Sequence, residues 1–171
     1  DILKKLTLNP IVEDEFIDGD ITIEDYLTEI TKSFEEISEK NFLLNFKKNL
    51  NPLAFFKSIE IVYGLRNFIG NANKYAKKNI FITVESDKIF TKIFIEDDGF
   101  GFPKDILNKI GEPYLKSITS KEESKKGLGL GIFIGKTLLE KNKAEITIQN
   151  SKKLTGAEIS IIWKNSDLLN L

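Results

Sequence analysis

EIVYGLRNFIGNANKYAKK, residues 60–78, is the stretch around which the rest of the chain is organised. It contains no proline, and its apolar residues recur with helical spacing, so it predicts one helix of about five turns. One side of this helix collects Val62, Leu65, Phe68, Ile69, Ala72 and Ala76. We expect that side to face the core.

The opposite side of the same helix carries Asn67, Asn71 and Lys74, at spacings of four and three residues. Surface helices usually fill their wet face with Lys and Glu, whereas this one presents two short amides and a cation. An amide oxygen can coordinate Mg²⁺, and a nearby lysine can meet a phosphate. The alternative is a solvated face in a sequence that is rich in Asn.

The composition is that of an ordinary globular domain. The chain has 171 residues, of which 41% are hydrophobic and 30% charged. The formal net charge is −1, so no global field favours nucleic acid. No apolar run approaches the ~20 residues that cross a bilayer, and no signal peptide is visible.

Three residue types are missing altogether: Cys, Met and His. Without Cys, the chain has no disulfide, thiol nucleophile or cysteine metal site. Without His, it has neither a Ser-His-Asp triad nor a histidine phosphoacceptor. Without Met, it is expected to be a piece of a longer protein.

The remaining elements predict an α+β fold. Further helices are predicted over 22–37, 104–109 and 132–142, and strands over 41–47, 80–87, 88–97, 144–148 and 156–163. The first of these helices has a capping pattern at Thr22 with Asp25, and its apolar stripe is Leu27, Ile30, Phe34 and Ile37. Because the strands are clustered, we expect a two-layer sandwich: a mixed, mostly antiparallel sheet with three helices on one face.

The stretch DDGFGFP, residues 97–103, follows the second strand of a predicted hairpin. A carboxylate at the end of a buried strand is costly unless it has a partner. Gly99 and Gly101 let the backbone turn sharply and let a flat ligand approach. Asp97 could then accept from the exocyclic amine of adenine, with Phe102 and Ile110 walling the ring. A plain Asp-Gly turn is the alternative.

A second glycine element, GLGLG at residues 127–131, opens a helix, where free N–H groups form an anion site. It lacks both the preceding strand of a dinucleotide fold and the Gly-Lys-Ser/Thr ending of a P-loop. The polar loop before it, residues 115–126, carries Lys116, Lys121, Lys125 and Lys126. This loop is either a flexible surface segment or a lid over a triphosphate.

Four ordered segments resemble one family: NFIGNANKY, DDGFGFP, GEPY and GLGLG. Together they resemble the nucleotide-binding domain of the GHKL superfamily, and within it the catalytic, ATP-binding domain of sensor histidine kinases. The resemblance covers roughly residues 20–164. The segments around NFIGNANKY and GLGLG look most similar to RegB/PrrB-type redox-responsive kinases.

The resemblance implies a role for each matching residue. Asn71 would ligate Mg²⁺, Asn67 would support it, and Lys74 would contact phosphate, so these three are the candidate catalytic residues. The other candidate ATP-binding residues are Tyr75, Asp97, Gly99, Gly101, Phe102, Ile110, Pro113, Tyr114, Lys126, Gly127, Leu128, Gly129, Leu130 and Gly131. Asp98 departs from the family, in which Asn is common, and adds a negative charge beside the site.

The implied function is transfer of the γ-phosphoryl group of ATP, with Mg²⁺, to a histidine outside this chain. The implied partners are the protein's own dimerisation helices and a response regulator, with no nucleic acid. The implied location is the cytoplasmic part of a membrane-anchored sensor, reached through segments outside this chain. Residues 1–19 would end the dimerisation segment, 20–164 would bind ATP, and 165–171 would be a tail.

Two alternatives stay open. The first is a GHKL ATPase of the gyrase, MutL or chaperone type, but such enzymes place a glutamate base where this chain has Asn67. The second is an adaptor that kept the fold and lost ATP. Intact Asn71, Asp97 and glycines argue against the adaptor.

Overall fold

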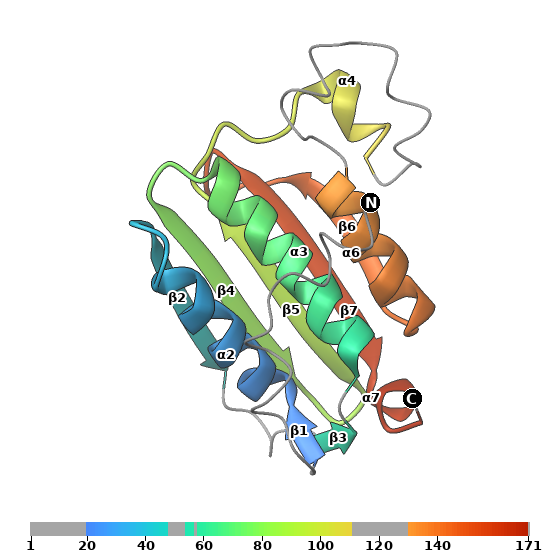
Figure 1. The fold of residues 1–171 in the computed structure, drawn as a ribbon. Coiled ribbons are helices and arrows are strands. Elements are labelled where there is room, and N and C mark those ends of the chain that lie inside the picture. The colour runs from blue at the N-terminus through green and yellow to red at the C-terminus, as the bar shows by residue number, and fades with distance from the viewer. Residues whose placement is uncertain (1–19, 48–53, 57, 111–129, 171) are drawn as a thin grey trace, which may run out of the picture.

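The computed structural model describes residues 20–47, 54–56, 58–110 and 130–170. It is a two-layer α+β sandwich in which α2, α3 and α6 cover one face of a sheet, which confirms the predicted fold class (Figure 1). The helices are α2 (Ile23–Glu35), α3 (Ile59–Tyr75), α4 (Lys104–Leu107), α6 (Leu130–Lys141) and α7 (Asn165–Leu168). The strands are β1 (Asp20–Thr22), β2 (Asn41–Lys47), β3 (Ala54–Phe56), β4 (Asn79–Ser86), β5 (Phe90–Asp97), β6 (Glu145–Asn150) and β7 (Ala157–Lys164).

The main sheet has five strands in the order β2-β4-β5-β7-β6. The β2–β4 pair is parallel, and the other three pairs are antiparallel. Ile82 lies opposite Ile95, which lies opposite Ile159 on the next strand, and all three are buried. The period-two alternation of the strands thus places one apolar row after another against the helices.

Helix α3 lies over the middle of the sheet, between α2 and α6 (Figure 1). All six residues of its predicted apolar stripe are buried. Three of them, Leu65, Phe68 and Ile69, are fully buried. The 3.6-residue period therefore predicted correctly which side of α3 faces the core.

The end of α3 differs from the prediction, because the helix stops at Tyr75 and not at Lys78. The Asp98 carboxylate explains this difference. It accepts hydrogen bonds from the backbone N–H groups of Lys77, Lys78 and Asn79, at 2.8 to 3.0 Å. These donors bind a carboxylate about 20 residues away in sequence, so the chain leaves the helix and enters β4.

Helix α2 begins as predicted, with a capping box between Thr22 and Asp25. Leu27 and Ile30 are buried, and Phe34 packs against the core from a partly buried position. The prediction for Ile37 was wrong, because α2 ends at Glu35 and Ile37 is 78% exposed.

Two further elements depart from the sequence prediction. β1 and β3 pair as a small antiparallel sheet, with Ile21 opposite Phe55, and the sequence predicted neither strand. The segment predicted as a C-terminal tail contains α7, whose Leu168 is 1% exposed. The expected end of a dimerisation helix over residues 1–19 lies outside the described residues.

Helix α6 ends in a Schellman motif built on an unusual residue. Lys143 N–H donates to Glu140 O and Ala144 N–H to Leu139 O, while Lys143 has φ 70°. A left-handed residue with a side chain costs about 1–2 kcal/mol, partly offset by glycine's greater entropy loss.

We therefore expect Lys143→Gly to raise the free energy of unfolding by about 1 kcal/mol. Urea unfolding measures this as a higher midpoint with an unchanged slope. Thr137→Gly, at an exposed position inside the same helix, is the control and should lower the midpoint. A Lys143→Gly midpoint equal to or below wild type would contradict the expectation.

Candidate nucleotide-binding site

The last turn of α3, the loop after β5 and the first turn of α6 all lie toward one end of the domain (Figure 1). A Cβ at Gly99 would lie 2.3 Å from the backbone oxygen of Tyr75, the last residue of α3. A Cβ at Gly131 would lie 3.8 Å from Asn67 Oδ1. The loop after β5 and the start of α6 therefore both contact α3.

Asp97 ends β5 and is 2% exposed. Its Oδ1 accepts hydrogen bonds from Gly99 N–H at 2.8 Å and from Ala157 N–H at 3.4 Å. Burial raises the pKa of the Asp97 carboxyl, and these two hydrogen bonds only partly oppose that rise. Both hydrogen bonds go to Oδ1, so this atom fixes the carboxylate in place and Oδ2 remains as the second acceptor.

Three glycines bring backbone unusually close to Asp97 and its loop. Gly99 has no room for a side chain, because a Cβ there would lie against the backbone oxygen of Tyr75. Gly101 has φ +73°, and a Cβ there would meet Asn150 Oδ1 at 2.7 Å. A Cβ at Gly156 would lie 2.1 Å from both the backbone oxygen and Oδ1 of Asp97. The sequence identified Gly99 and Gly101 as site residues but missed Gly156.

Asn150, at the end of β6, is a second residue that the sequence missed. Its Oδ1 accepts from Phe102 N–H at 2.7 Å, and its Nδ2 donates to Phe102 O at 2.9 Å. Phe102 is thereby fixed through its backbone and is 6% exposed. Ile110, the other predicted wall residue, is partly buried against the same core. A polar residue at a strand end was the only sequence signal for Asn150.

The polar face of α3 carries the amides that the sequence singled out. Asn67 Nδ2 donates to Tyr63 O at 2.7 Å, within the same helix. Asn71, one turn further on, is half-buried, and no hydrogen bond joins its side chain to another described residue. Lys74 is exposed, with its ammonium 5.3 Å from the centroid of the Tyr75 ring. The predicted face therefore exists, and Asn71 presents a half-buried amide on it.

The negative charge expected at Asp98 is held by hydrogen bonds from the residues that follow α3. Besides the three backbone donors already described, Asn79 Nδ2 donates to its carboxylate at 3.1 Å. Burial alone would raise the pKa of Asp98, but these hydrogen bonds outweigh it and lower the pKa. Asp98 in turn adds to the rise in the pKa of Asp97. Its negative charge therefore acts on the site through Asp97.

One lysine from a different part of the chain, Lys40, also lies close to this end of the domain. Lys40 Nζ donates to the backbone oxygens of Asn73 and Lys74, where the negative end of the α3 dipole lies. Its charge lowers the pKa of Asp97, against the dominant effect of burial. No local sequence pattern predicted this role of Lys40, which precedes β2.

Several predicted site residues lie outside the described residues: Pro113, Tyr114, Lys126, Gly127, Leu128 and Gly129. The predicted lid over residues 115–126 lies outside them too. Leu130 and Gly131 open α6, at the place where the glycine segment predicted a helix start. Within the described part of the chain, no three His, Cys, Asp or Glu side chains gather into a metal cluster.

A comparison with protein families decides what this arrangement is. The model of the histidine kinase-, DNA gyrase B- and HSP90-like ATPases matches residues 57–167. The chain belongs to this family. The resemblance to the GHKL superfamily is thereby confirmed, and this ATPase-family domain is an ATP-binding module of the histidine kinase type.

Two curated relatives of this ATPase-family domain are sensor kinases. It is 34% identical over 119 residues to the sensor histidine kinase RegB of Cereibacter sphaeroides, over 61% of this chain and 26% of RegB. It is 30% identical over 88 residues to the sensor protein SrrB of Staphylococcus aureus, over 50% of this chain and 15% of SrrB. The similarity to RegB confirms the narrower resemblance. The chain therefore spans about a quarter of the length of RegB and a smaller share of SrrB.

Solved structures confirm the fold of the ATPase-family domain. The catalytic domain of the histidine kinase ThkA superposes with a TM-score of 0.69 at 18% identity, covering 87% of this chain and 97% of that one. The mycobacterial sensor histidine kinase MprB gives 0.67 at 15% identity, covering 86% and 97%. In the described part of the chain, every helix is too short or too polar to span a bilayer.

Proposed function

We propose that this domain binds ATP with Mg²⁺ and presents the γ-phosphoryl group to a histidine that lies outside the 171 residues. The names of the sensor kinase relatives support the reaction class. The absence of any His in the sequence supports an acceptor elsewhere. Catalysis then comes from positioning and charge neutralisation, because no nucleophile of this chain is needed.

The adenine assignment rests on the buried carboxylate of Asp97. A buried carboxylate is costly, and its Oδ1 is already held by Gly99 and Ala157. Its Oδ2 is then the acceptor for the exocyclic amine of adenine. Guanine presents a carbonyl at the same position, so two acceptors would face each other. The site therefore selects ATP over GTP.

Asn71 is the proposed Mg²⁺ ligand, and its surroundings fit that role. Its amide is half-buried on the α3 face and makes no hydrogen bond to a described residue. Since no acidic cluster accompanies it among the described residues, a single amide would hold a metal that the phosphates mainly ligate. When bound, Mg²⁺ supplies neutralisation of phosphate charge. Lys74, one turn beyond, adds a second positive charge.

Asn67 weighs against the rival ATPase function. Hydrolysis requires a base that activates water, and an amide neither takes a proton nor carries charge. The Asn67 amide is also engaged, through its donation to Tyr63 O. We propose that it shapes the α3 face beside Gly131 and supports Asn71.

The proposed partners follow from the same reaction. The histidine would lie on dimerisation helices of the same protein, and the phosphoryl group would pass on to a response regulator. The full-length protein would be a membrane-anchored sensor with this domain in the cytoplasm. Nucleic acid is no partner, as the net charge of −1 suggests.

Asp97→Asn tests the adenine assignment through a change of base preference. If the new amide keeps Oδ1 on Gly99 and Ala157, its Nδ2 faces the adenine amine, donor against donor. ATP affinity should then fall about 10- to 100-fold, the range for a lost hydrogen bond to a charged group. The guanine carbonyl now meets a donor, so the preference for ATP over GTP should shrink or reverse. Isothermal titration calorimetry with both nucleotides measures this.

The same variant should be more stable than the wild type at pH 7. Burial raises the pKa of Asp97 above its ordinary value of 3.8, so the folded state holds the proton to a higher pH than the unfolded chain. Wild-type stability therefore falls as the pH rises through that interval, and Asp97→Asn removes this fall. A variant that is less stable yet keeps full ATP selectivity would contradict the role of Asp97.

A further inference from the structure

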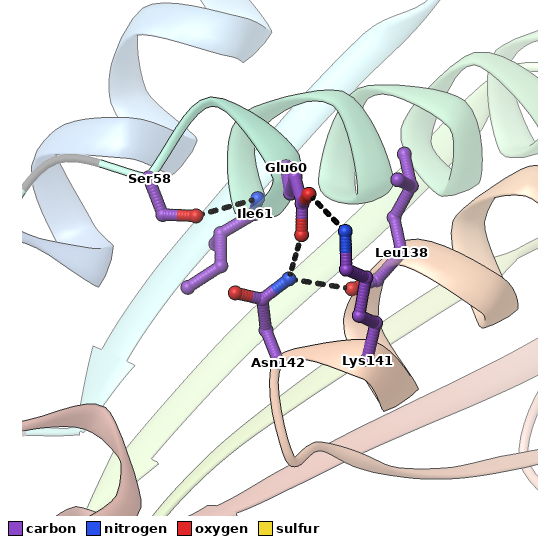
Figure 2. A network of polar contacts seen from close by, with 6 residues as sticks. All are labelled: Ser58, Glu60, Ile61, Leu138, Lys141 and Asn142. Atoms are coloured by element: carbon purple, nitrogen blue, oxygen red, sulfur yellow. Dashed lines mark hydrogen bonds and ion pairs between the residues drawn. The ribbon is translucent and has the colours of Figure 1, made fainter. Parts of the chain in front are cut away.

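A polar junction joins α3 to α6 (Figure 2). It lies at the end of the domain opposite the candidate site (Figure 1). Glu60, in the first turn of α3, accepts from Lys141 Nζ at 2.6 Å through Oε1. Its Oε2 accepts from Asn142 Nδ2 at 2.7 Å. Hydrogen bonds from Lys141 and then Asn142 are the main reasons that the pKa of Glu60 is lowered.

Asn142 ties this junction to the sheet as well. Its Nδ2 also donates to Leu138 O at 2.8 Å, and its backbone oxygen accepts from Trp163 Nε1 at 2.9 Å. Asn142 is 9% exposed and Trp163 is fully buried. Two helices and β7 therefore meet at one residue, which directly follows α6.

Between this junction and the candidate site, α3 and α6 pack too closely to slide freely. A Cβ at Gly64 would lie 2.6 Å from Leu139 Cγ. A Cβ at Gly135 would lie 2.7 Å from the Phe68 ring. Each helix thus contributes one glycine that receives a bulky side chain of the other. Because interiors are close-packed, a shift at one end of such a pair is transmitted along it.

The far end of the same pair is the candidate site. Gly131, the second residue of α6, lies against Asn67 of α3. Asn142 lies eleven positions further along the chain, which corresponds to about 16 Å of helix. The contact of the end of α6 with α3 is polar and directional, whereas the contacts at Gly64 and Gly135, between this end and Gly131, are apolar.

We propose that Glu60 is a positioning residue: its hydrogen bond to Asn142 sets where α6 lies along α3, and so places the start of α6 for phosphate binding. This inference rests on the proposed nucleotide function. The Lys141 ion pair contributes less, because the side chains of Lys141 and Glu60 are 67% and 38% exposed. The more buried Asn142 hydrogen bond carries the positioning.

The test compares ligands with and without phosphates. Glu60→Ala should weaken ADP binding about 3- to 30-fold, the range for network mutations remote from a site, and leave adenosine affinity unchanged. Glu60→Gln keeps an acceptor for Asn142 and should retain most of the ADP affinity. Glu140→Ala removes the Lys136–Glu140 ion pair on α6, which does not involve α3, and should behave as wild type. All are measured by calorimetry on folded protein, as verified by circular dichroism.

A second measurement is independent of nucleotide. In ¹⁵N NMR spectra of the free protein, the Gly131 backbone amide and the Asn67 side-chain amide should shift in Glu60→Ala and not in Glu140→Ala. Equal losses of ADP and adenosine affinity, or unmoved Gly131 and Asn67 signals, would overturn the positioning role. A wild type that binds neither ligand while those signals still shift would overturn only the proposed function.

Discussion

Replacing Gly156 by alanine is expected to abolish detectable nucleotide binding and to lower the free energy of unfolding by about 3 kcal/mol, the upper part of the range for overpacking. The new Cβ would lie 2.1 Å from both the backbone oxygen and Oδ1 of Asp97. Relieving this contact requires a shift of Asp97, whose Oδ1 accepts hydrogen bonds from Gly99 and Ala157. The residue assigned to adenine must therefore be displaced.

Gly131→Ala is the matched control for stability. Among the described residues, a Cβ there would find its nearest neighbours at 3.8 Å, an ordinary contact, and alanine favours the helix. Thermal unfolding should thus show a large fall for Gly156→Ala and none for Gly131→Ala. Unchanged ATP affinity in a Gly156→Ala protein would mean that Asp97 does not bind adenine.

Asn71→Ala is expected to slow phosphoryl transfer about 100-fold, as when one preorganised electrostatic group is lost from an active site. It should also remove most of the dependence of ATP affinity on Mg²⁺, because the α3 face would keep no amide ligand at that position. The assay supplies a histidine-bearing dimerisation segment, fused or in trans, and follows label from γ-labelled ATP. Asn73→Ala is the matched control, since its Oδ1 accepts from Ser38 Oγ at 2.7 Å, away from the proposed ligand.

The same assay separates the kinase from the ATPase. Without the histidine segment, wild-type protein should neither take up label nor release phosphate at a steady rate, because Asn67 is no base. If the isolated chain hydrolysed ATP steadily, and Asn67→Ala stopped it, the ATPase function would replace the proposed one. If ATP affinity depended on Mg²⁺ to the same extent in wild type and Asn71→Ala, Asn71 would not be the Mg²⁺ ligand.

The sequence predicted those features that a local pattern can encode. Helical periodicity identified the buried side of α3, and strand alternation identified the sheet face that packs against it. Four ordered short segments pointed to the family. Asp97 was recognisable because an acidic residue ends an apolar strand and precedes two glycines. Each of these signals lies within a few neighbouring residues.

What the sequence could not predict depends on partners far along the chain. Asn150 and Phe102 are 48 residues apart, and Asp97 and Ala157 are 60 apart. The early end of α3 is set by Asp98, which competes for N–H groups that a local pattern assigns to the helix. Such competition is decided by tertiary packing. The predicted roles of residues 111–129 stay predictions, because those residues are outside the described part of the chain.

Trp163 gives this domain an optical probe that needs no chemical label. It is the single tryptophan of the chain, and it is fully buried on β7. Its indole N–H donates to the residue that closes α6, so its environment belongs both to the sheet and to the helix above it. Water reaching the ring would shift its fluorescence to longer wavelengths. The emission therefore reports when α6 separates from the sheet, even where overall helix content barely changes.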